Sequence, residues 1–160
     1  MSKATVAVLM GGPDAERSVS ITSGTAIADA LETTGKFEIQ RICINRITQE
    51  EINDIDADVF FPALHGPFGE GGALQLLLER CGKPFVGSGS EASAVAMDKC
   101  KTKEIAVSID VPTPLWSTVE SKEDINLPLP LVLKPNDDGS SIGIALCHTQ
   151  TQLEEVCKNL

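Results

Sequence analysis

The sequence is short of basic residues. Its 160 residues include 13 lysines and arginines against 23 aspartates and glutamates, which gives a formal net charge of −10. No stretch gathers lysines and arginines into a stripe that could neutralise a row of phosphates, so nucleic acid is not an expected partner. Hydrophobic residues make up 42% of the chain, enough for a real core. The composition predicts a globular protein of one compact domain or two small ones.

Clustered cysteines are also missing. The five cysteines are odd in number and widely spread, with no Cys-x-x-Cys pair and no Cys/His group at metal-ligand spacing. They are Cys43, Cys81, Cys100, Cys147 and Cys157. This number and spacing of cysteines predicts no metal site built from Cys or from Cys and His. It is typical of reduced thiols in a cytoplasmic protein.

Long apolar runs are absent as well. The first one, "ATVAVLM", stops at Gly11 and Gly12 and is too short for a signal peptide or a membrane span. Internal repeats and low-complexity segments are not found either. We therefore expect no membrane association and a cytoplasmic location.

The first part of the chain alternates strand and helix patterns. Apolar, β-branched runs predict strands at 4–10, 37–45, 57–64 and 83–89. Helical patterns occupy 18–35 and 72–82, and residues 50–55 are a short helical or irregular stretch. This alternation predicts an α/β fold with a parallel sheet, whose ligand site lies at the carboxyl ends of the strands. Glycine-rich loops follow two of the predicted strands there, after Met10 and after Leu64.

A different pattern begins near residues 87–93. Residues 90–110 predict two short helices, and the prolines of 111–119 are typical of a crossover. Residues 128–147 predict two strands joined by a polar, glycine-containing loop, and 149–160 predict a helix capped by Thr149 or Thr151. We expect two domains, at residues 1–90 and 91–160.

The loop "GGPDAERSVS" is the first candidate site. Gly11 and Gly12 follow a strand, and Ser18 or Ser20 could open a helix whose backbone N–H groups bind an anion. An ordinary serine-capped loop is an equally good interpretation of the spacing. Glu16 is harder to explain in that way, since a carboxylate at the top of a strand can bind an ammonium group.

The loop "HGPFGEGG" is the second candidate. His65 ends a predicted buried strand, where an imidazole can bond a carbonyl or stand near a ligand carboxylate, and both interpretations remain open. Glycines surround Glu70 and allow backbone to approach closely; they are Gly66, Gly69, Gly71 and Gly72. Glu70 itself could orient a neighbouring basic side chain or act on a substrate.

Lysines form the third candidate. Lys99, Lys101 and Lys103 lie on a predicted helix, where a solvated charged face is the simpler interpretation. Lys134 lies along an apolar strand, where its charged end must find a partner, and such a lysine is often a phosphate ligand. The loop 136–143 that follows could close its amides and hydroxyls over phosphates, or be a plain hairpin with a polar tip.

Three segments together resemble a known family. Residues 6–31, 63–103 and 130–146 closely resemble, in order and spacing, the N-terminal half of D-alanine–D-alanine ligases of the ATP-grasp superfamily. The resemblance implies a doubly wound parallel-sheet domain that binds substrate, followed by the start of an ATP-grasp domain. It also implies that the "HGPFGEGG" loop lines the site of the first amino acid.

The same resemblance implies an activity. The family joins two D-alanines, using ATP and Mg²⁺, through an acyl phosphate, for peptidoglycan precursor synthesis. Because phosphoryl transfer needs positioning and charge neutralisation, lysines suit it. By resemblance, Lys99 and Lys134 contact ATP phosphates, and Ser140 and Ser141 lie in the loop that closes over them and keeps water out.

Further roles follow from the resemblance alone. Glu16 would hold the ammonium of the first D-alanine and form a catalytic hydrogen-bonded group with Ser140, and His65 would lie near the carboxylate of that D-alanine. A homodimer is expected, because family members pair through this domain.

Two departures from the family remain. Gly71 stands where the family usually has an aspartate, and family members are about twice as long as this chain. We therefore expect this chain to supply half of the ligase and to be inactive alone, with no metal ligands of its own. The alternative is a short, non-catalytic module that binds a small molecule or regulates. The identity of the second substrate, D-alanine, D-lactate or D-serine, is not fixed by these residues.

Overall fold

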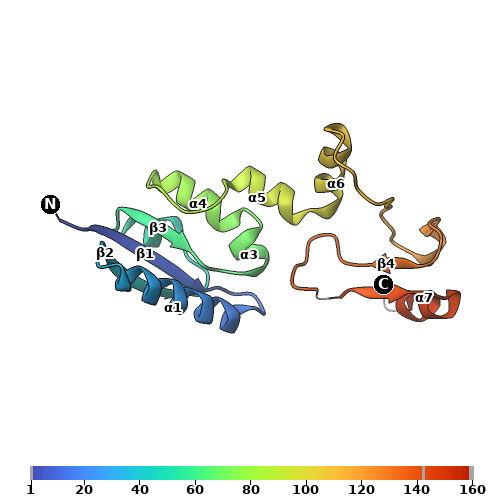
Figure 1. Ribbon diagram of the computed structural model, residues 1–160, viewed down its shortest axis with the longest axis horizontal. Coiled ribbons are helices and arrows are strands. Elements are labelled where there is room, and N and C mark those ends of the chain that lie inside the picture. The colour runs from blue at the N-terminus through green and yellow to red at the C-terminus, as the bar shows by residue number, and fades with distance from the viewer. Residues whose placement is uncertain (1, 142, 159–160) are drawn as a thin grey trace. The chain divides into compact units, whose positions relative to one another are not determined.

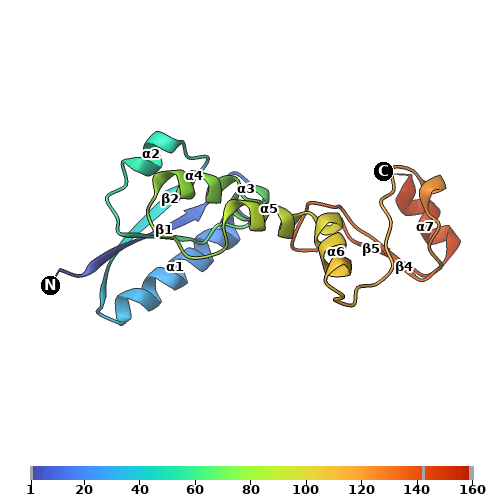
Figure 2. The ribbon, with the colours of Figure 1, turned by 90° about the horizontal axis from the view of Figure 1, so that it is seen from above.

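The chain divides into two compact units. The computed structural model describes residues 2–141 and 143–158. The first unit is Met1–Met97 and the second is Asp98–Leu160. The domain limits expected from the sequence, 1–90 and 91–160, stay a prediction about the intact protein. Figure 1 labels most elements of both units, and Figure 2 adds labels for α2 and β5.

The first unit is built on a three-stranded parallel sheet. Its strands are β1 (Ala4–Gly11), β2 (Phe37–Ile44) and β3 (Val59–Pro62), in the order β2-β1-β3. Val6 of β1 is paired with Ile39 on one side and Val59 on the other. The predicted α/β fold with a parallel sheet is therefore confirmed, with β1 at the centre (Figure 1).

Helices cover both faces of this sheet (Figure 1). Side chains alternate along β1, so Val8 packs on one face with Ala28 of α1 (Arg17–Thr33), and Leu9 packs on the other with Leu78 of α4 (Ala73–Cys81). Both faces of β1 are buried, which explains its continuous apolar sequence. Shorter helices complete the unit, namely α2 (Gln49–Asn53), α3 (Gly66–Glu70) and α5 (Ser90–Met97), and α2 is seen best in Figure 2.

Three local predictions for the first unit were wrong. Helix α1 begins at Arg17 with Glu16 as its N-cap residue, so neither Ser18 nor Ser20 opens it. Residues 66–70, expected as loop, form helix α3, which begins with a proline at an early position. The strand expected at 83–89 is reduced to a single bridge between Phe60 and Phe85, since Pro84 has no N–H to extend a ladder.

The second unit contains a hairpin and two helices. Helix α6 (Lys99–Ser108) is followed by a 3₁₀ turn (Lys122–Asp124), strands β4 (Leu131–Leu133) and β5 (Ala145–Cys147), and helix α7 (Gln150–Cys157). The two strands are antiparallel, with Val132 opposite Leu146, as predicted.

Two predictions for this unit can be compared directly. Thr149 caps α7 in a capping box with Gln152, so the first of the two predicted caps is confirmed. Residues 159 and 160 of that predicted helix, and Ile142 of the predicted loop, lie outside the described residues. Lys134, expected along an apolar strand, follows the last residue of β4 and is exposed.

Across residues 2–141 and 143–158, every helix is too short or too polar to cross a membrane.

Candidate functional site

The carboxyl edge of the sheet carries the first candidate site. Arg17 fixes the loop after β1, because its guanidinium donates to the carbonyl of Gly12 at 2.8 Å and to that of Ile44, the last residue of β2, at 2.6 Å. Glu16 lies beside it, half-buried at the start of α1. The loop that holds Glu16 is thereby tied to the neighbouring strand.

Ser20 joins the ends of two strands. Its hydroxyl is fully buried, accepts the N–H of Gly11 at 2.8 Å and donates to the carbonyl of Ala63 at 2.8 Å. Gly11 ends β1, and Ala63 directly follows β3. The sequence analysis missed this role, although the spacing of Ser20, Gly24 and Ala28 at four-residue intervals marks a face of small residues against the sheet.

His65 is held by two side chains. Its Nε2 lies 3.2 Å from the Ser23 hydroxyl, and its Nδ1 lies 3.5 Å from one carboxylate oxygen of Glu70. The other Glu70 oxygen accepts the N–H of Gly66 at 2.8 Å. The tautomer of the ring decides which partner donates in the contact with the Ser23 hydroxyl. Of the two roles left open for Glu70, its contact with Nδ1 is of the orienting kind, with His65 in place of a lysine or arginine.

Asp14 connects the two glycine-rich loops. Its carboxylate accepts the N–H of Phe68 at 2.9 Å. A Cβ on Gly66, which has a φ of +84°, would lie 2.8 Å from the Asp14 Cβ, and a Cβ on Gly69 would lie 2.4 Å from the Leu64 Cβ. Gly66 is needed because the two loops touch there, and Gly69 because α3 packs directly on Leu64 at the end of the preceding segment. The position of Asp14 in the site gave no signal in the sequence.

Glu16 and His65 thus both lie at the carboxyl edge of the sheet, after β1 and after β3. This edge offers a half-buried carboxylate, an imidazole fixed by Ser23 and Glu70, and closely packed backbone. Such a set can bind a small zwitterion through its ammonium and its carboxylate.

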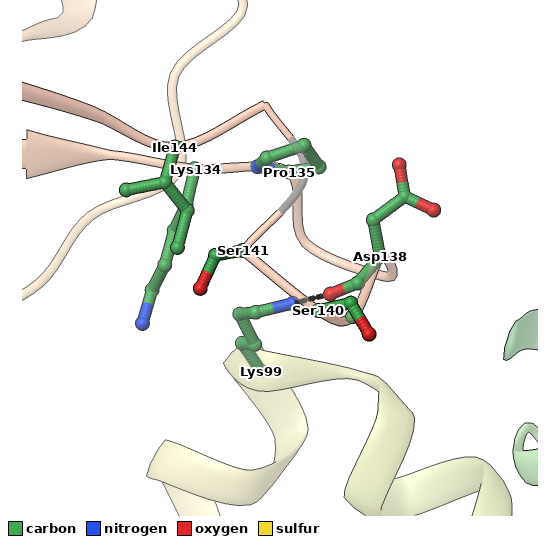
Figure 3. A pocket seen from close by; sticks show the side chains of 8 residues that line it. Lys99, Lys134, Pro135, Asp138, Ser140, Ser141 and Ile144 are labelled. Atoms are coloured by element: carbon green, nitrogen blue, oxygen red, sulfur yellow. Dashed lines mark hydrogen bonds between the residues drawn. The ribbon is translucent and has the colours of Figure 1, made fainter. Parts of the chain in front are cut away.

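A pocket in the second unit carries the other candidate site. It has a volume of about 150 Å³ and is seen from close by in Figure 3. Its lining residues are Lys99, Lys134, Pro135, Asp138, Gly139, Ser140, Ser141 and Ile144. Four residues predicted as phosphate ligands are therefore brought to one pocket, namely Lys99, Lys134, Ser140 and Ser141.

The pocket contains two lysines and is bounded by the loop that follows β4. The Lys99 ammonium donates to the carbonyls of Asp138 at 2.5 Å and Asn136 at 3.1 Å. Figure 3 shows the first of these bonds and the Asp138 carboxylate pointing away from Lys99. Ser140 and Ser141 have left-handed backbone, with φ of 50° and 61°, which is uncommon for residues other than glycine.

The chemistry of this pocket suits an anion of the phosphate type. It offers two lysines, the Ser140 and Ser141 hydroxyls and the backbone of residues 139–141. Sites that enclose a whole drug-sized ligand measure roughly 300–1,000 Å³. At about 150 Å³, the pocket has room for phosphate groups rather than for a whole nucleotide.

The other two lysines of α6 have structural partners. Lys101 forms an ion pair with Asp98 at 3.3 Å, and Lys103 donates to the Thr113 hydroxyl at 2.7 Å. Lys101 keeps the exposed position of the simpler interpretation, whereas Lys103 is half-buried and the Lys99 ammonium is bonded to loop carbonyls. In residues 2–141 and 143–158, no three His, Cys, Asp or Glu side chains gather closely enough to hold a metal ion.

The comparison with known families agrees with the motifs. A profile described as D-ala D-ala ligase N-terminus matches residues 45–88, which include β3, His65 and Glu70. The matched segment includes the part of the first candidate site that follows β3, while Glu16 and the loop after β1 lie outside it.

Whole-chain comparisons extend this match. The D-alanine–D-alanine ligase of Desulforudis audaxviator is 42% identical over 156 residues, which cover 93% of this chain and 51% of that protein. The crystal structure of D-alanine–D-alanine ligase from Bacillus anthracis complexed with ATP has a TM-score of 0.82 and 31% identity, covering 99% of this chain and 53% of that one. VanG D-Ala:D-Ser ligase from Enterococcus faecalis has a TM-score of 0.79 and 25% identity, covering 98% and 59%.

These matches confirm the resemblance drawn from the three motifs. They also confirm the fold class, since the ligase structures superpose on nearly the whole chain. The chain spans about half the length of the curated relatives it matches.

Proposed function

Since this chain is related, over nearly its whole length, to about half of D-alanine–D-alanine ligases, we propose that it supplies the N-terminal half of such an enzyme. The intact enzyme would join two D-alanines in an ATP-dependent reaction that serves peptidoglycan precursor synthesis. One observation carries the proposal. Lys99, Lys134, Ser140 and Ser141 line a single pocket where the family resemblance expects the phosphates of ATP.

The first D-alanine would bind at the carboxyl edge of the sheet. The Glu16 carboxylate would hold its ammonium, and His65 would lie near its carboxylate. The hydrogen bonds from Arg17 to Gly12 and Ile44 support this assignment, because they fix the loop that carries Glu16. Ser23 and Glu70 hold the His65 ring in one orientation before any substrate arrives.

The phosphates of ATP would bind in the pocket of the second unit. ATP, when bound, supplies the phosphoryl group that activates the carboxylate of the first D-alanine. Lys99 and Lys134 would neutralise the phosphate charge, and Ser140 and Ser141 would donate hydroxyls to phosphate oxygens. Mg²⁺ would accompany ATP, with its ligands outside this chain. The hydrogen-bonded group of Glu16 and Ser140 is part of this proposal.

Partners and location are proposed on the family relationship. We assign the intact enzyme to the cytoplasm, as a homodimer that pairs through the first unit, without nucleic acid or membrane as a partner. D-Alanine is the first substrate, and D-alanine is also the second one proposed, since the curated relatives carry that name.

A fusion protein tests the proposal. We would join this chain to the remaining part of the Desulforudis audaxviator ligase and measure ADP release with ATP, Mg²⁺ and D-alanine. D-Alanine-dependent ADP formation is expected from the fusion and none from the 160-residue chain alone. Turnover by a pure sample of the 160-residue chain would refute the view that it supplies only half of the enzyme.

Variants of the fusion test the assignment of Glu16. Glu16→Gln should raise the KM for the first D-alanine roughly tenfold or more, because a hydrogen bond between charged groups is lost. Glu50→Gln, an exposed change in α2, is the matched control and should leave KM unchanged. An unchanged KM in Glu16→Gln would remove Glu16 from the site. A chain that binds D-alanine while every fusion stays inactive would favour the non-catalytic module.

A further inference from the structure

One polar cluster joins helix α6 to the loop after β4. Four of its bonds involve Asn136, which lies 37 residues after Lys99 in the sequence. The Asn136 carbonyl accepts from the backbone N–H of Lys99 at 3.1 Å and from the Lys99 ammonium at 3.1 Å. The first turn of α6 and the pocket loop are therefore held together at one residue.

The Asn136 side chain uses both ends of its amide. Its Oδ1 accepts the backbone N–H of Cys100 at 3.0 Å, and its Nδ2 donates to Asp98 Oδ1 at 3.0 Å. Alanine could make neither bond. Aspartate has no donor and would set a second carboxylate against Asp98. The site thus requires a short side chain that donates and accepts.

Asp98 is the partner that receives this bond. It is the N-cap residue of α6, where its carboxylate accepts the backbone N–H of Lys101 at 3.1 Å. The hydrogen bond from the Lys101 backbone, together with that from the Asn136 side chain, lowers the pKa of Asp98 to about 2. Asp98 therefore stays a charged acceptor at neutral pH.

The cluster sets the direction of Lys99. The Lys99 ammonium is aimed at the carbonyls of Asn136 and Asp138, which belong to the loop that lines the pocket. Neither Asp98 nor Asn136 lines the pocket, so they act on it only through Lys99 and the loop. A lysine side chain has many rotamers, and fixing it in one of them costs conformational entropy. Here that entropy is lost on folding, so it is not lost again when a ligand binds.

We propose that Asp98 and Asn136 are positioning residues, which hold the Lys99 ammonium and the loop 136–141 in the arrangement that binds phosphate. This inference rests on the proposed function of the pocket. The pair has no contact with phosphate of its own, and its effect is on affinity for the phosphate chain.

The test uses the 160-residue chain and inorganic tripolyphosphate as the probe. Binding is followed by ¹⁵N NMR at the amides of Lys99, Ser140 and Ser141. Asn136→Ala should weaken binding roughly 10- to 100-fold, the loss expected when a positioned group is displaced. Asn126→Ala, the same change at an exposed asparagine of the second unit, should leave the dissociation constant within about twofold.

A swap of the two residues separates positioning from mere stability. Asn136→Asp alone should weaken binding, because its carboxylate faces Asp98. Adding Asp98→Asn restores one amide and one carboxylate, with the same net charge as the wild type, and should recover most of the affinity. A general loss of stability would not be reversed by this second change. Fluorescence of Trp116, the one tryptophan, checks that the second unit of each variant is folded.

Each outcome decides the inference. Binding by the wild type with an unchanged dissociation constant in Asn136→Ala would overturn the positioning role alone and leave the proposed pocket intact. A swap that binds no better than Asn136→Asp would also overturn it. A wild-type chain that shows no tripolyphosphate shifts at these amides would overturn both the proposed phosphate pocket and the positioning role.

Discussion

The two units are stabilised in different ways. Of the sixteen buried hydrophobic residues among those described, fourteen lie in the first unit, and Cys147 and Leu153 are the two in the second. The second unit instead exposes several large apolar side chains, including Val107, Ile109 and Leu146. Its parts are joined by polar groups such as Asp98 and Asn136.

This difference fits the two binding tasks proposed for the two units. A tightly packed core gives the first unit fixed strand ends, which suits the binding of a small substrate at a set geometry. A thin core and polar links should make the free energy of local opening lower in the second unit, which would suit the closure proposed for the loop after β4. Four changes test the comparison, from the largest expected effect to the smallest.

Phe60→Ala should have the largest effect, and only on the first unit. Phe60 is fully buried in β3, in the cluster that contains Leu9 and Leu78. Its loss leaves a cavity and should lower the free energy of unfolding by about 3–5 kcal/mol. In urea, the transition seen by far-UV circular dichroism should move, while the fluorescence transition of Trp116 in the second unit should not.

The control is Leu76→Ala, at a side chain of α4 that is 40% exposed, with an expected change within about 0.5 kcal/mol. Transitions of circular dichroism and of Trp116 that move together in Phe60→Ala would mean that the chain unfolds as one cooperative body.

Leu153→Ala should have the next largest effect, on the second unit. Leu153 of α7 is 5% exposed and is one of the two buried hydrophobic residues there. The expected loss is about 2–3 kcal/mol, at the low end for a leucine, because a thin core relaxes around a cavity. The Trp116 transition in urea should report it. Val107→Ala, at an exposed position of α6, is the control, and an equal shift in both variants would show that Leu153 is not a core residue.

Ser20→Ala should have a moderate effect on the first unit. It leaves the buried N–H of Gly11 and the carbonyl of Ala63 without this partner. The expected loss is about 1–2 kcal/mol, measured by the circular dichroism transition in urea. Ser18→Ala changes an exposed serine of the same helix and should be nearly neutral. A neutral Ser20→Ala would mean that the two strand ends are held by packing alone.

Lowering the pH should have the smallest effect. Through Asp98 it should lower the free energy of unfolding of the second unit. The pKa of Asp98 is lowered from 3.8 to about 2 in the folded chain, chiefly by the hydrogen bond from the Lys101 backbone. The stabilisation is therefore full above pH 3.8 and is lost as the pH falls from there toward 2. The Trp116 transition of wild type should approach that of Asp98→Asn over this window. A difference between the two that is as large at pH 2 as at pH 5 would contradict this assignment.

The sequence analysis predicted well where the pattern is local. Alternating strands and helices and the Thr149 cap follow from neighbouring residues, and the structure agrees. The apolar run before Lys134 suggested a phosphate ligand there, whereas Lys99 was assigned to phosphate by the family resemblance, since its helix alone suggests a solvated side chain.

The residues it missed depend on contacts between distant segments. Ser23 meets His65 across 42 residues, and Asn136 meets Asp98 across 38. Their roles exist only once the chain has folded, because each is an ordinary polar residue in its own neighbourhood. The same holds for α3, where the Glu70 side chain returns to the Gly66 N–H and the pattern of glycines had suggested only a loop.

The central position of β1 has a consequence for the order of folding. Ala4 pairs with Phe37, and Val6 pairs with Val59, so each side of β1 is completed only by residues far along the chain. Folding is slowed when the chain must close long loops, and lose entropy, before native contacts form. During synthesis β1 therefore stays unpaired until α1 and then β2 have been made, and its second edge is paired only when β3 follows. Until then its apolar surface is exposed to other chains.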